Sequence, residues 1–338
     1  MLTNLWKKGT DFLGSKFAIM GGAMSWVSEA HLVSSISNAG GFGVLACGAL
    51  STAQLRDEIR MTQQLTQKPF GVNLIVIHPD LDSLLDICIE SKVSHIVLAG
   101  GLPSGKIIGK IKNAGARSMC FAPSLTIARR LVRIGVDALI IEGMEAGGHI
   151  GAVSTSVLAQ EILPFFKTHA EVSNVPIFVA GGIGTGDMIG SYLNMGASGC
   201  QIGTLFVCST ECKAHPKFKE IFIKSSSRDA VPSVQLSADF PVAQVRAITN
   251  AASMRFLELQ REVIEMHGSG KISKEEGQLL IEKFWAGSLR RAVIDGDVDG
   301  GSVMAGQSVG FVTNIRSTEE IISGLVNEIE TYLKGISA

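Results

Sequence analysis

The chain has 338 residues, enough for one large domain or for one domain with a smaller satellite. Its 46% hydrophobic and 18% charged residues are typical of a globular protein, and its 38 glycines exceed average usage. A formal net charge of −1, without a basic stripe interleaved with aromatic residues, argues against a nucleic-acid partner.

The N-terminal residues 1–11 contain no apolar segment of the signal-peptide type. No apolar run reaches the roughly 18 residues that a membrane-spanning helix needs. The six cysteines lie mostly in apolar segments, as expected of thiols in a reducing compartment. We therefore expect a cytoplasmic protein without a membrane partner.

Short apolar or β-rich segments recur along the first two-thirds of the chain, at the spacing of βα units. The predicted strands are 17–20, 41–47, 70–76, 95–99, 118–122, 138–141, 176–180 and 200–207. Near-continuous apolar runs of this kind favour a parallel sheet that is covered on both faces.

The segments between these strands place apolar residues at helical spacing. The predicted helices are 28–38, 51–65, 80–91, 126–134 and 187–195. Glycines 40, 115, 135 and 196 follow helical segments, where glycine commonly ends a helix.

The alternation stops near residue 215, and no strand is expected between 214 and 300. Two long amphipathic helices are predicted instead, 251–266 and 274–293, the second opened by a capping box of Ser273 and Glu276. A final helix is predicted over 317–333. These patterns predict an α/β fold: a (β/α)8 TIM barrel at 1–215 and 301–338, with a smaller inserted helical subdomain at 216–300 covering the barrel mouth.

Two glycine-rich loops follow the last two predicted strands, where barrels often bind phosphate. The first contains Gly181 and Gly182, and the second runs from Gln201 through Gly203 and Thr204. Backbone N–H groups without side-chain bulk, at a helix N-terminus, form an anion cradle. The alternative is a pair of tight turns that serve packing alone.

The loop after strand 138–141 presents a single imidazole, His149, behind Gly147 and Gly148. A strand that ends in small residues and one titratable group is typical of an α/β enzyme that offers an acid or base to a flat ligand. The alternative is a surface histidine on a tight turn. Glu142 and Glu145 flank this loop, and either could orient His149 or a cofactor hydroxyl.

Other strand ends add candidate ligand contacts. Gly22, Ala23 and Met24 form a loop along which a ring could lie. Asn73 ends an apolar strand as a candidate ligand contact, and the alternative is an ordinary turn asparagine. The remaining histidines lack a glycine context, and we interpret them as structural. Cys208, Cys212 and His215 lack a fourth ligand at zinc spacing, so no metal site is predicted.

A nucleotide P-loop is excluded for a similar reason. Gly105 and Lys106 are followed by Ile107, where Ser or Thr would be needed to bind Mg²⁺. Neither cradle is followed by the acidic residue of a dinucleotide fingerprint, so a mononucleotide phosphate, such as that of FMN, fits better.

The chain resembles the FMN-dependent nitronate monooxygenase (2-nitropropane dioxygenase) family, which includes type II enoyl-acyl-carrier-protein reductases. The matching motifs are 22–26, 38–43, 69–73, Glu-Gly-Met-Glu-Ala-Gly-Gly-His-Ile-Gly at 142–151, 180–183, 201–206 and 296–307. The 22–24 loop reads Gly-Ala-Met, where many relatives have Gly-Gly-Met or Ala-Pro-Met. Pro123-Ser124 resembles the reductases, whereas the helical stretch 256–293 resembles the nitronate monooxygenases.

This resemblance implies an FMN-binding barrel. The FMN phosphate would lie at Gly181, Gly182, Gly203 and Thr204. The isoalloxazine would lie over 22–24, near Asn73 and Gly147, with Glu142 and Gln201 also in cofactor contact. His149 matches the family's catalytic histidine.

We therefore expect an oxidoreductase that oxidises alkyl nitronates with O₂. The alternative within the family is an NAD(P)H-dependent enoyl-acyl-carrier-protein reductase with an acyl-thioester substrate. A non-redox barrel such as a phosphosugar isomerase or aldolase is a further alternative, although no strand end offers a Schiff-base lysine or paired carboxylates. The oligomeric state stays open, with a homodimer among the alternatives.

Overall fold

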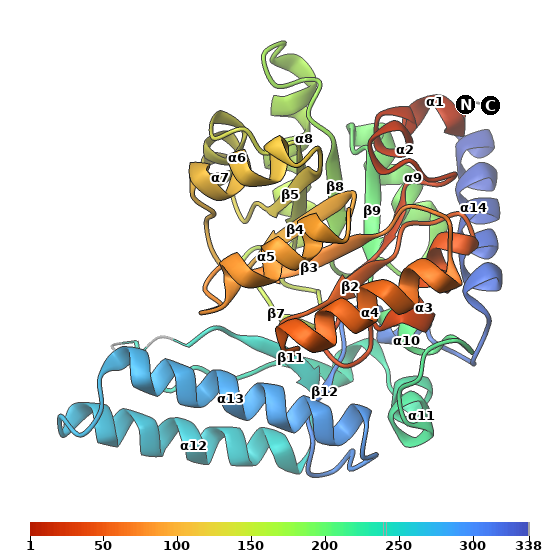
Figure 1. Cartoon of the computed structure of the whole chain (residues 1–338). Coiled ribbons are helices and arrows are strands. Elements are labelled where there is room, and N and C mark those ends of the chain that lie inside the picture. The colour runs from red at the N-terminus through yellow and green to blue at the C-terminus, as the bar shows by residue number, and fades with distance from the viewer. Residues whose placement is uncertain (239, 241, 337–338) are drawn as a thin grey trace.

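The structure is a computed structural model that describes residues 1–238, 240 and 242–336. Eight parallel strands form the centre of the molecule (Figure 1). They are β1 (Ile19–Gly21), β2 (Val44–Ala46), β3 (Gly71–Ile75), β4 (His95–Ala99), β5 (Arg117–Phe121), β6 (Ala138–Glu142), β8 (Ile177–Ala180) and β9 (Gly199–Ile202). Their order is β1-β9-β8-β6-β5-β4-β3-β2. Between β1 and β2, the N–H of Gly21 donates to Phe42 O at 2.9 Å, and the N–H of Phe42 donates to Ile19 O at 2.9 Å. The predicted (β/α)8 barrel is therefore confirmed. All eight predicted strands are present, but the second half of the predicted strand 200–207 is a short helix over Thr204–Val207.

The strands are apolar because both of their faces are covered. Leu139, Ile140 and Ile141 on β6 are fully buried, as are Val72 and Leu74 on β3. One face of each strand fills the barrel interior, and the other packs against the outer helices. Burial on both sides is the physical reason why these short runs could be recognised without an alternating pattern.

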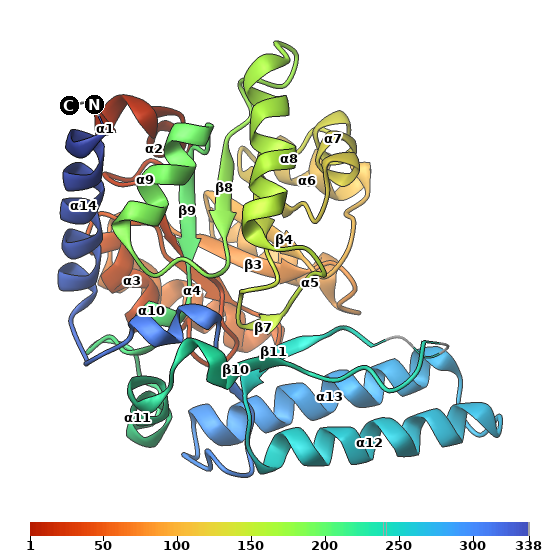
Figure 2. The same ribbon diagram turned by 180° about the vertical axis from the view of Figure 1, so that it is seen from behind.

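An outer layer of helices surrounds the barrel (Figures 1 and 2). It contains α3 (Ala30–Asn38), α4 (Thr52–Leu65), α5 (Leu81–Glu90), α6 (Gly105–Asn113), α7 (Leu125–Arg133), α8 (Thr155–Thr168), α9 (Gly186–Met195) and α14 (Thr318–Gly335). The short helices α1 (Leu2–Leu5) and α2 (Lys7–Leu13) precede β1. The helices predicted here are confirmed, whereas α1, α2, α6 and α8 were not predicted. Glycines 40, 115, 135 and 196 all have positive φ, as the predicted helix ends require.

A second group of helices lies below the carboxyl ends of the strands (Figures 1 and 2). It contains α10 (Thr204–Val207), α11 (Pro216–Lys224), the 3-10 helices 227–229 and 307–311, α12 (Ala251–Gly268) and α13 (Lys274–Val293). Helices α12 and α13 pack on each other through a separate apolar cluster, in which the rings of Phe256 and Trp285 lie 4.2 Å apart. Ser273 and Glu276 form the predicted capping box of α13.

A small second sheet joins this helical layer to the barrel, and it contradicts the prediction of no strand between 214 and 300. It consists of β7 (Gly148–His149), β10 (Ala230–Pro232), β11 (Val245–Ile248) and β12 (Val303–Met304). These strands have two to four residues, too few to show a period of two, and their partners are distant in sequence.

The domain limits 1–215, 216–300 and 301–338 stay a prediction, and they include Asp239, Pro241, Ser337 and Ala338, which lie outside the described residues. Among the helices of the described chain, none is both long and apolar enough to cross a membrane.

Candidate functional site

A cavity opens at the carboxyl ends of the barrel strands, where active sites of such barrels gather. Its volume, counted with the open mouth, is about 1370 Å³. Apart from Glu145, the residues that the sequence suggested for cofactor contact or catalysis line it: Gly22, Ala23, Met24, Asn73, Glu142, Gly147, His149, Gly181, Gly182, Gln201, Gly203 and Thr204. The structure thus brings together residues from the ends of five strands, β1, β3, β6, β8 and β9, and from the loops that follow them.

One wall of this cavity consists of backbone N–H groups. Within the described residues, the N–H groups of Gly182, Ile183, Gly203 and Thr204 donate to no protein acceptor. Gly182 has φ +72°, a conformation that presents successive N–H groups in one direction and favours glycine. Unpaired N–H groups that line a cavity are suited to bind an anion.

The N-terminus of α9 itself is already occupied. The N–H of Gly186 donates to Glu328 Oε2 at 2.6 Å, and the hydroxyl of Thr185 accepts from the N–H of Met188. The first glycine loop does lead into a helix N-terminus, as expected, but two N–H groups of that first turn already have acceptors. The donors of Gly182 and Ile183 precede the helix, whereas the carboxylate of Glu328 on α14 binds the N–H of Gly186 at its start.

Side-chain amides and a carboxyl group supply the polar part of the cavity. The Nδ2 of Asn73 donates to Val97 O at 3.2 Å, which leaves its oxygen as an acceptor. The side-chain amide of Gln201 is buried and has no hydrogen-bond partner among the described residues. Gly22 leaves space beside this side chain, since a Cβ at Gly22 would lie 3.4 Å from Gln201 Cγ. Such convergent polar groups in an apolar pocket orient a ligand.

The structure gives Glu142 and Glu145 different roles, between which the sequence could not choose. Glu145 Oε2 accepts hydrogen bonds from the N–H and the hydroxyl of Thr155, both at 2.9 Å, and so fixes the start of α8. The carboxyl group of Glu142 has no hydrogen-bond partner among the described residues, and Glu142 lines the cavity together with His149. Burial raises the pKa of Glu142 to about 7, and the nearby charge of His149 opposes this rise.

His149 is held at the cavity edge by two different elements. Gly148 and His149 pair as β7 with β11, in antiparallel register with Arg246 and Val245. The Nε2 of His149 lies 3.3 Å from Oε1 of Glu282 on α13. The His149 side chain is still half exposed, so it lies at the edge of the cavity where solvent reaches it.

Gly147 packs against the backbone of a segment that is distant in sequence. A Cβ at Gly147 would lie 2.5 Å from the backbone of Ala305 and Gly306. The close approach is therefore to the C-terminal segment of the protein itself. At Gly203, in contrast, a Cβ would meet only Met24, with the sulfur at 3.2 Å, so Gly203 and Met24 together determine the width of the cavity.

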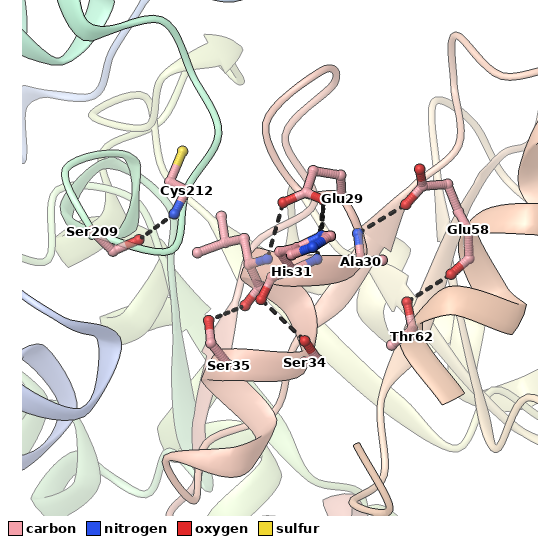
Figure 3. Close-up of polar contacts among 10 residues, drawn as sticks. Glu29, Ala30, His31, Ser34, Ser35, Glu58, Thr62, Ser209 and Cys212 are labelled. Atoms are coloured by element: carbon pink, nitrogen blue, oxygen red, sulfur yellow. Dashed lines mark hydrogen bonds and ion pairs between the residues drawn. The ribbon is translucent and has the colours of Figure 1, made fainter. Parts of the chain in front are cut away.

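The other histidines take part in local structure, as we interpreted them. Figure 3 shows His31 at the start of α3, where Glu29 caps the helix and accepts from the His31 ring at 3.0 Å. In the same view Glu58 accepts from the N–H of Ala30. His95 is buried between Phe12 O and Ser94, and this burial lowers its pKa to about 4.

Sequence reasoning missed several residues that the helical layer and the C-terminal segment bring to the cavity. They are Phe218 on α11, Leu289 on α13, Gly306 and Ser308, and Met304 on β12 lines the cavity beside them. The N–H of Gly306 donates to the hydroxyl of Thr204 at 3.0 Å, which fixes the end of the cradle. The motif at 296–307 was the one signal in the sequence that could have located Met304 and Gly306.

Trp26 is a further residue with unusual geometry beside the cavity. Its φ is +67°, its indole N–H is buried without a protein partner, and the guanidinium of Arg290 lies 5.8 Å from its ring centroid. This cation–π contact joins α13 to the loop that follows β1.

The cysteines and His215 lie away from the cavity lining. Cys208 donates to Lys219 O, and the His215 ring accepts from the N–H of Lys217 at the start of α11. All six thiols are buried, and none of them forms a disulfide bond. The part of the chain that the structure describes holds no cluster of three His, Cys, Asp or Glu residues suited to a metal ion.

Comparison with known proteins agrees with this geometry. Residues 7–328 match the family model described as nitronate monooxygenase. The structure is similar to that of FabK from Thermotoga maritima, with a TM-score of 0.82, 34% identity and 97% of each chain covered.

Curated relatives at 27% identity include a probable nitronate monooxygenase from Staphylococcus aureus, with 98% of this chain and 99% of the relative covered. Another, also 27% identical with 97% of each chain covered, is the (3aS,4S,5R,7aS)-5-hydroxy-7a-methyl-1-oxo-octahydro-1H-indene-4-carboxyl-CoA dehydrogenase of Mycobacterium tuberculosis. The chain therefore belongs to the nitronate monooxygenase family of flavin-dependent oxidoreductases.

Proposed function

We propose that this protein is an FMN-dependent nitronate monooxygenase that oxidises alkyl nitronates with O₂. The observation that carries the proposal is the convergence of unpaired backbone N–H groups, three polar side chains and His149 on one cavity. A cavity with an anion cradle and polar groups around an apolar wall suits a flavin mononucleotide, which has a phosphate at one end and a flat polar ring at the other.

The residues present fit this cofactor. The N–H groups of Gly182, Gly203 and Thr204 would hold the phosphate, since they have no acceptor within the described protein. The side chains of Asn73 and Gln201 have free hydrogen-bonding atoms to offer the polar edge of the ring. When bound, FMN would supply the electron transfer between the substrate and O₂.

His149 is proposed as the catalytic residue. Its imidazole lies at the cavity edge, where it can bind the anionic nitro group of a nitronate or, with a neutral nitroalkane, take the proton that converts it to the nitronate. Glu142 lies on the same side, and a carboxyl group with a pKa of about 7 exchanges between acid and anion near neutral pH. It can therefore exchange protons with the site.

A second candidate function is an NAD(P)H-dependent enoyl-acyl-carrier-protein reductase. It is favoured by the 34% identity with FabK, an enoyl-acyl-carrier-protein reductase of the same family, which exceeds the 27% identity with the probable nitronate monooxygenase. In that reaction His149 would donate a proton to the reduced acyl thioester.

An anaerobic titration of the purified protein separates the candidates. We expect a yellow protein whose flavin absorbance is bleached by an alkyl nitronate and not by NADH or NADPH. Bleaching by a reduced nicotinamide, followed by reoxidation with crotonyl thioester, would instead favour the reductase. A colourless protein that binds no added FMN would contradict both and favour a non-redox barrel.

We also propose the division into a barrel at 1–215 and 301–338 and a helical subdomain at 216–300. The separate apolar cluster between α12 and α13 supports it. A cytoplasmic location and a homodimer are part of the same proposal, and size-exclusion chromatography with light scattering tests the latter.

A further inference from the structure

A second, more open cavity lies beside the first, at the carboxyl ends of β4, β5 and β6. Its volume, counted with its mouth, is about 910 Å³. Four residues line both cavities: Ala99, Phe121, Glu142 and His149. The two spaces therefore meet at the edge that carries the proposed catalytic groups.

The second cavity is apolar away from this junction. Its walls include Leu102, Pro123, Ile127 and Ile150. Among its described lining residues, Glu142 and His149 are the only ones with ionisable side chains. A charged or strongly polar ligand would therefore be desolvated there without a side-chain partner, which is costly.

Large apolar side chains are also left in contact with solvent along this cavity. Leu102 is 39% exposed at its rim, and Ile77 is 74% exposed on the neighbouring loop. The loops are adjacent, because a Cβ on Gly101 would lie 3.5 Å from Ile77 Cγ2. Neighbouring exposed apolar side chains at the edge of a cavity are typical of a surface that a ligand covers.

We propose that this second cavity binds the aliphatic chain of the substrate, while the reacting group lies at the junction beside Glu142 and His149. This inference deepens the proposed function and rests on it. An aliphatic chain is the occupant because it needs no polar partner and gains from leaving water. The chain could belong to an alkyl nitronate or to an acyl thioester, and both present the same chemistry to Leu102 and Ile127.

The test is a chain-length series on the FMN-loaded protein. It has one arm of primary alkyl nitronates and one arm of trans-2-enoyl thioesters with NADH. We expect kcat/KM to rise about threefold to fourfold per added methylene in the arm that reacts, the ratio that corresponds to about 0.8 kcal/mol per buried methylene. The arm that shows the rise identifies the source of the chain.

Leu102→Asp locates the effect in the second cavity. It places a charge at the apolar rim, and the gain per methylene should fall below about twofold. Met188→Asp is the matched control, because Met188 on α9 is 37% exposed and lines neither cavity. In Met188→Asp, kcat/KM should rise per added methylene as much as in the wild type.

Calorimetric titration with saturated acyl thioesters and neutral nitroalkanes of the same lengths gives a reading that does not depend on turnover. Affinity that rises with chain length and is weakened by Leu102→Asp supports the proposal. Affinity and kcat/KM independent of length, or a gain that Leu102→Asp leaves unchanged, overturn it. If chains bind in this way but neither substrate class reacts, the proposed function fails and the chain site stands. If short substrates react without any gain from chain length, the proposed function stands and the proposed chain site fails.

Discussion

Among single residues, Glu142 couples the cavity to pH. Its pKa is about 7 because burial disfavours the carboxylate, whereas in the unfolded chain it returns to its ordinary, lower value. The folded state therefore binds more protons than the unfolded state between these two values. The stability that this group contributes is fully present below the unfolded pKa and is lost as the pH rises through about 7.

We predict that Glu142→Gln removes this loss, because glutamine has nearly the same shape and no charge. The free energy of unfolding of the FMN-free variant should exceed that of the wild type by about 1–3 kcal/mol near pH 8 and should equal it near pH 4. Urea denaturation at both pH values measures the difference. A difference that does not depend on pH would show that the Glu142 carboxyl is not perturbed by burial.

Gly203 determines the width of the cavity together with Met24. We predict that Gly203→Leu weakens FMN binding by at least about tenfold, because the new side chain enters the space proposed for the cofactor. Fluorescence titration of the FMN-free protein measures the dissociation constant. Gly109→Leu is the control, since nothing lies within 4 Å of a Cβ at Gly109 on α6. Equal constants for the two variants would place FMN elsewhere.

The sequence predicted which residue types gather at the site, but it could not assign their contacts. In the sequence, the glycine-rich loops could be recognised after predicted strands, and Asn73 could be recognised as a polar residue at the end of an apolar strand. The choice between Glu142 and Glu145 depends on the hydrogen bonds from Thr155, which the sequence does not show. The role of Gly147 depends on the backbone at Ala305, more than 150 residues away.

The elements that position His149 are β7, β11 and α13. The eight barrel strands were predictable because burial on both faces makes them apolar. The small sheet was not, because a pair such as Gly148 with Arg246 is determined by tertiary packing. Arg246 is buried, and its guanidinium donates to Met144 O and Ala230 O, so a charged residue in the sequence concealed an interior strand.

We predict that Glu282→Gln lowers kcat about twofold to tenfold with little change in KM, because Glu282 on α13 holds one nitrogen of the His149 ring. Glu282 acts through His149 and is a positioning residue. The free energy of unfolding should change by less than about 1 kcal/mol, since the pair is half exposed.

Steady-state kinetics and urea denaturation of this variant measure the two effects. Glu258→Gln on α12 serves as the control, because Glu258 is exposed and lines neither cavity. A large loss of stability in Glu282→Gln, with kcat unchanged, would instead indicate that Glu282 serves only to hold α13 on the barrel.

For the whole molecule, the barrel and the helical layer meet around one cavity, so ligand binding should stabilise both together. We predict that FMN at about 100 times its dissociation constant stabilises the protein by about 2.7 kcal/mol, whereas riboflavin at the same concentration gives a smaller shift because it lacks the phosphate. Thermal denaturation with each ligand measures this. Equal shifts would argue against an anion cradle at Gly182, Gly203 and Thr204.

The most direct measurement for the account is the cofactor content and kcat/KM of His149→Ala, with either substrate class that the wild type turns over. We expect full FMN content with kcat/KM lower by about 10²–10⁴-fold, the usual contribution of a general acid or base. His169→Ala, whose ring stacks on Phe165, should match the wild type. Wild-type turnover in the FMN-loaded His149→Ala enzyme would contradict the central claim that this imidazole carries the proton chemistry of the cavity.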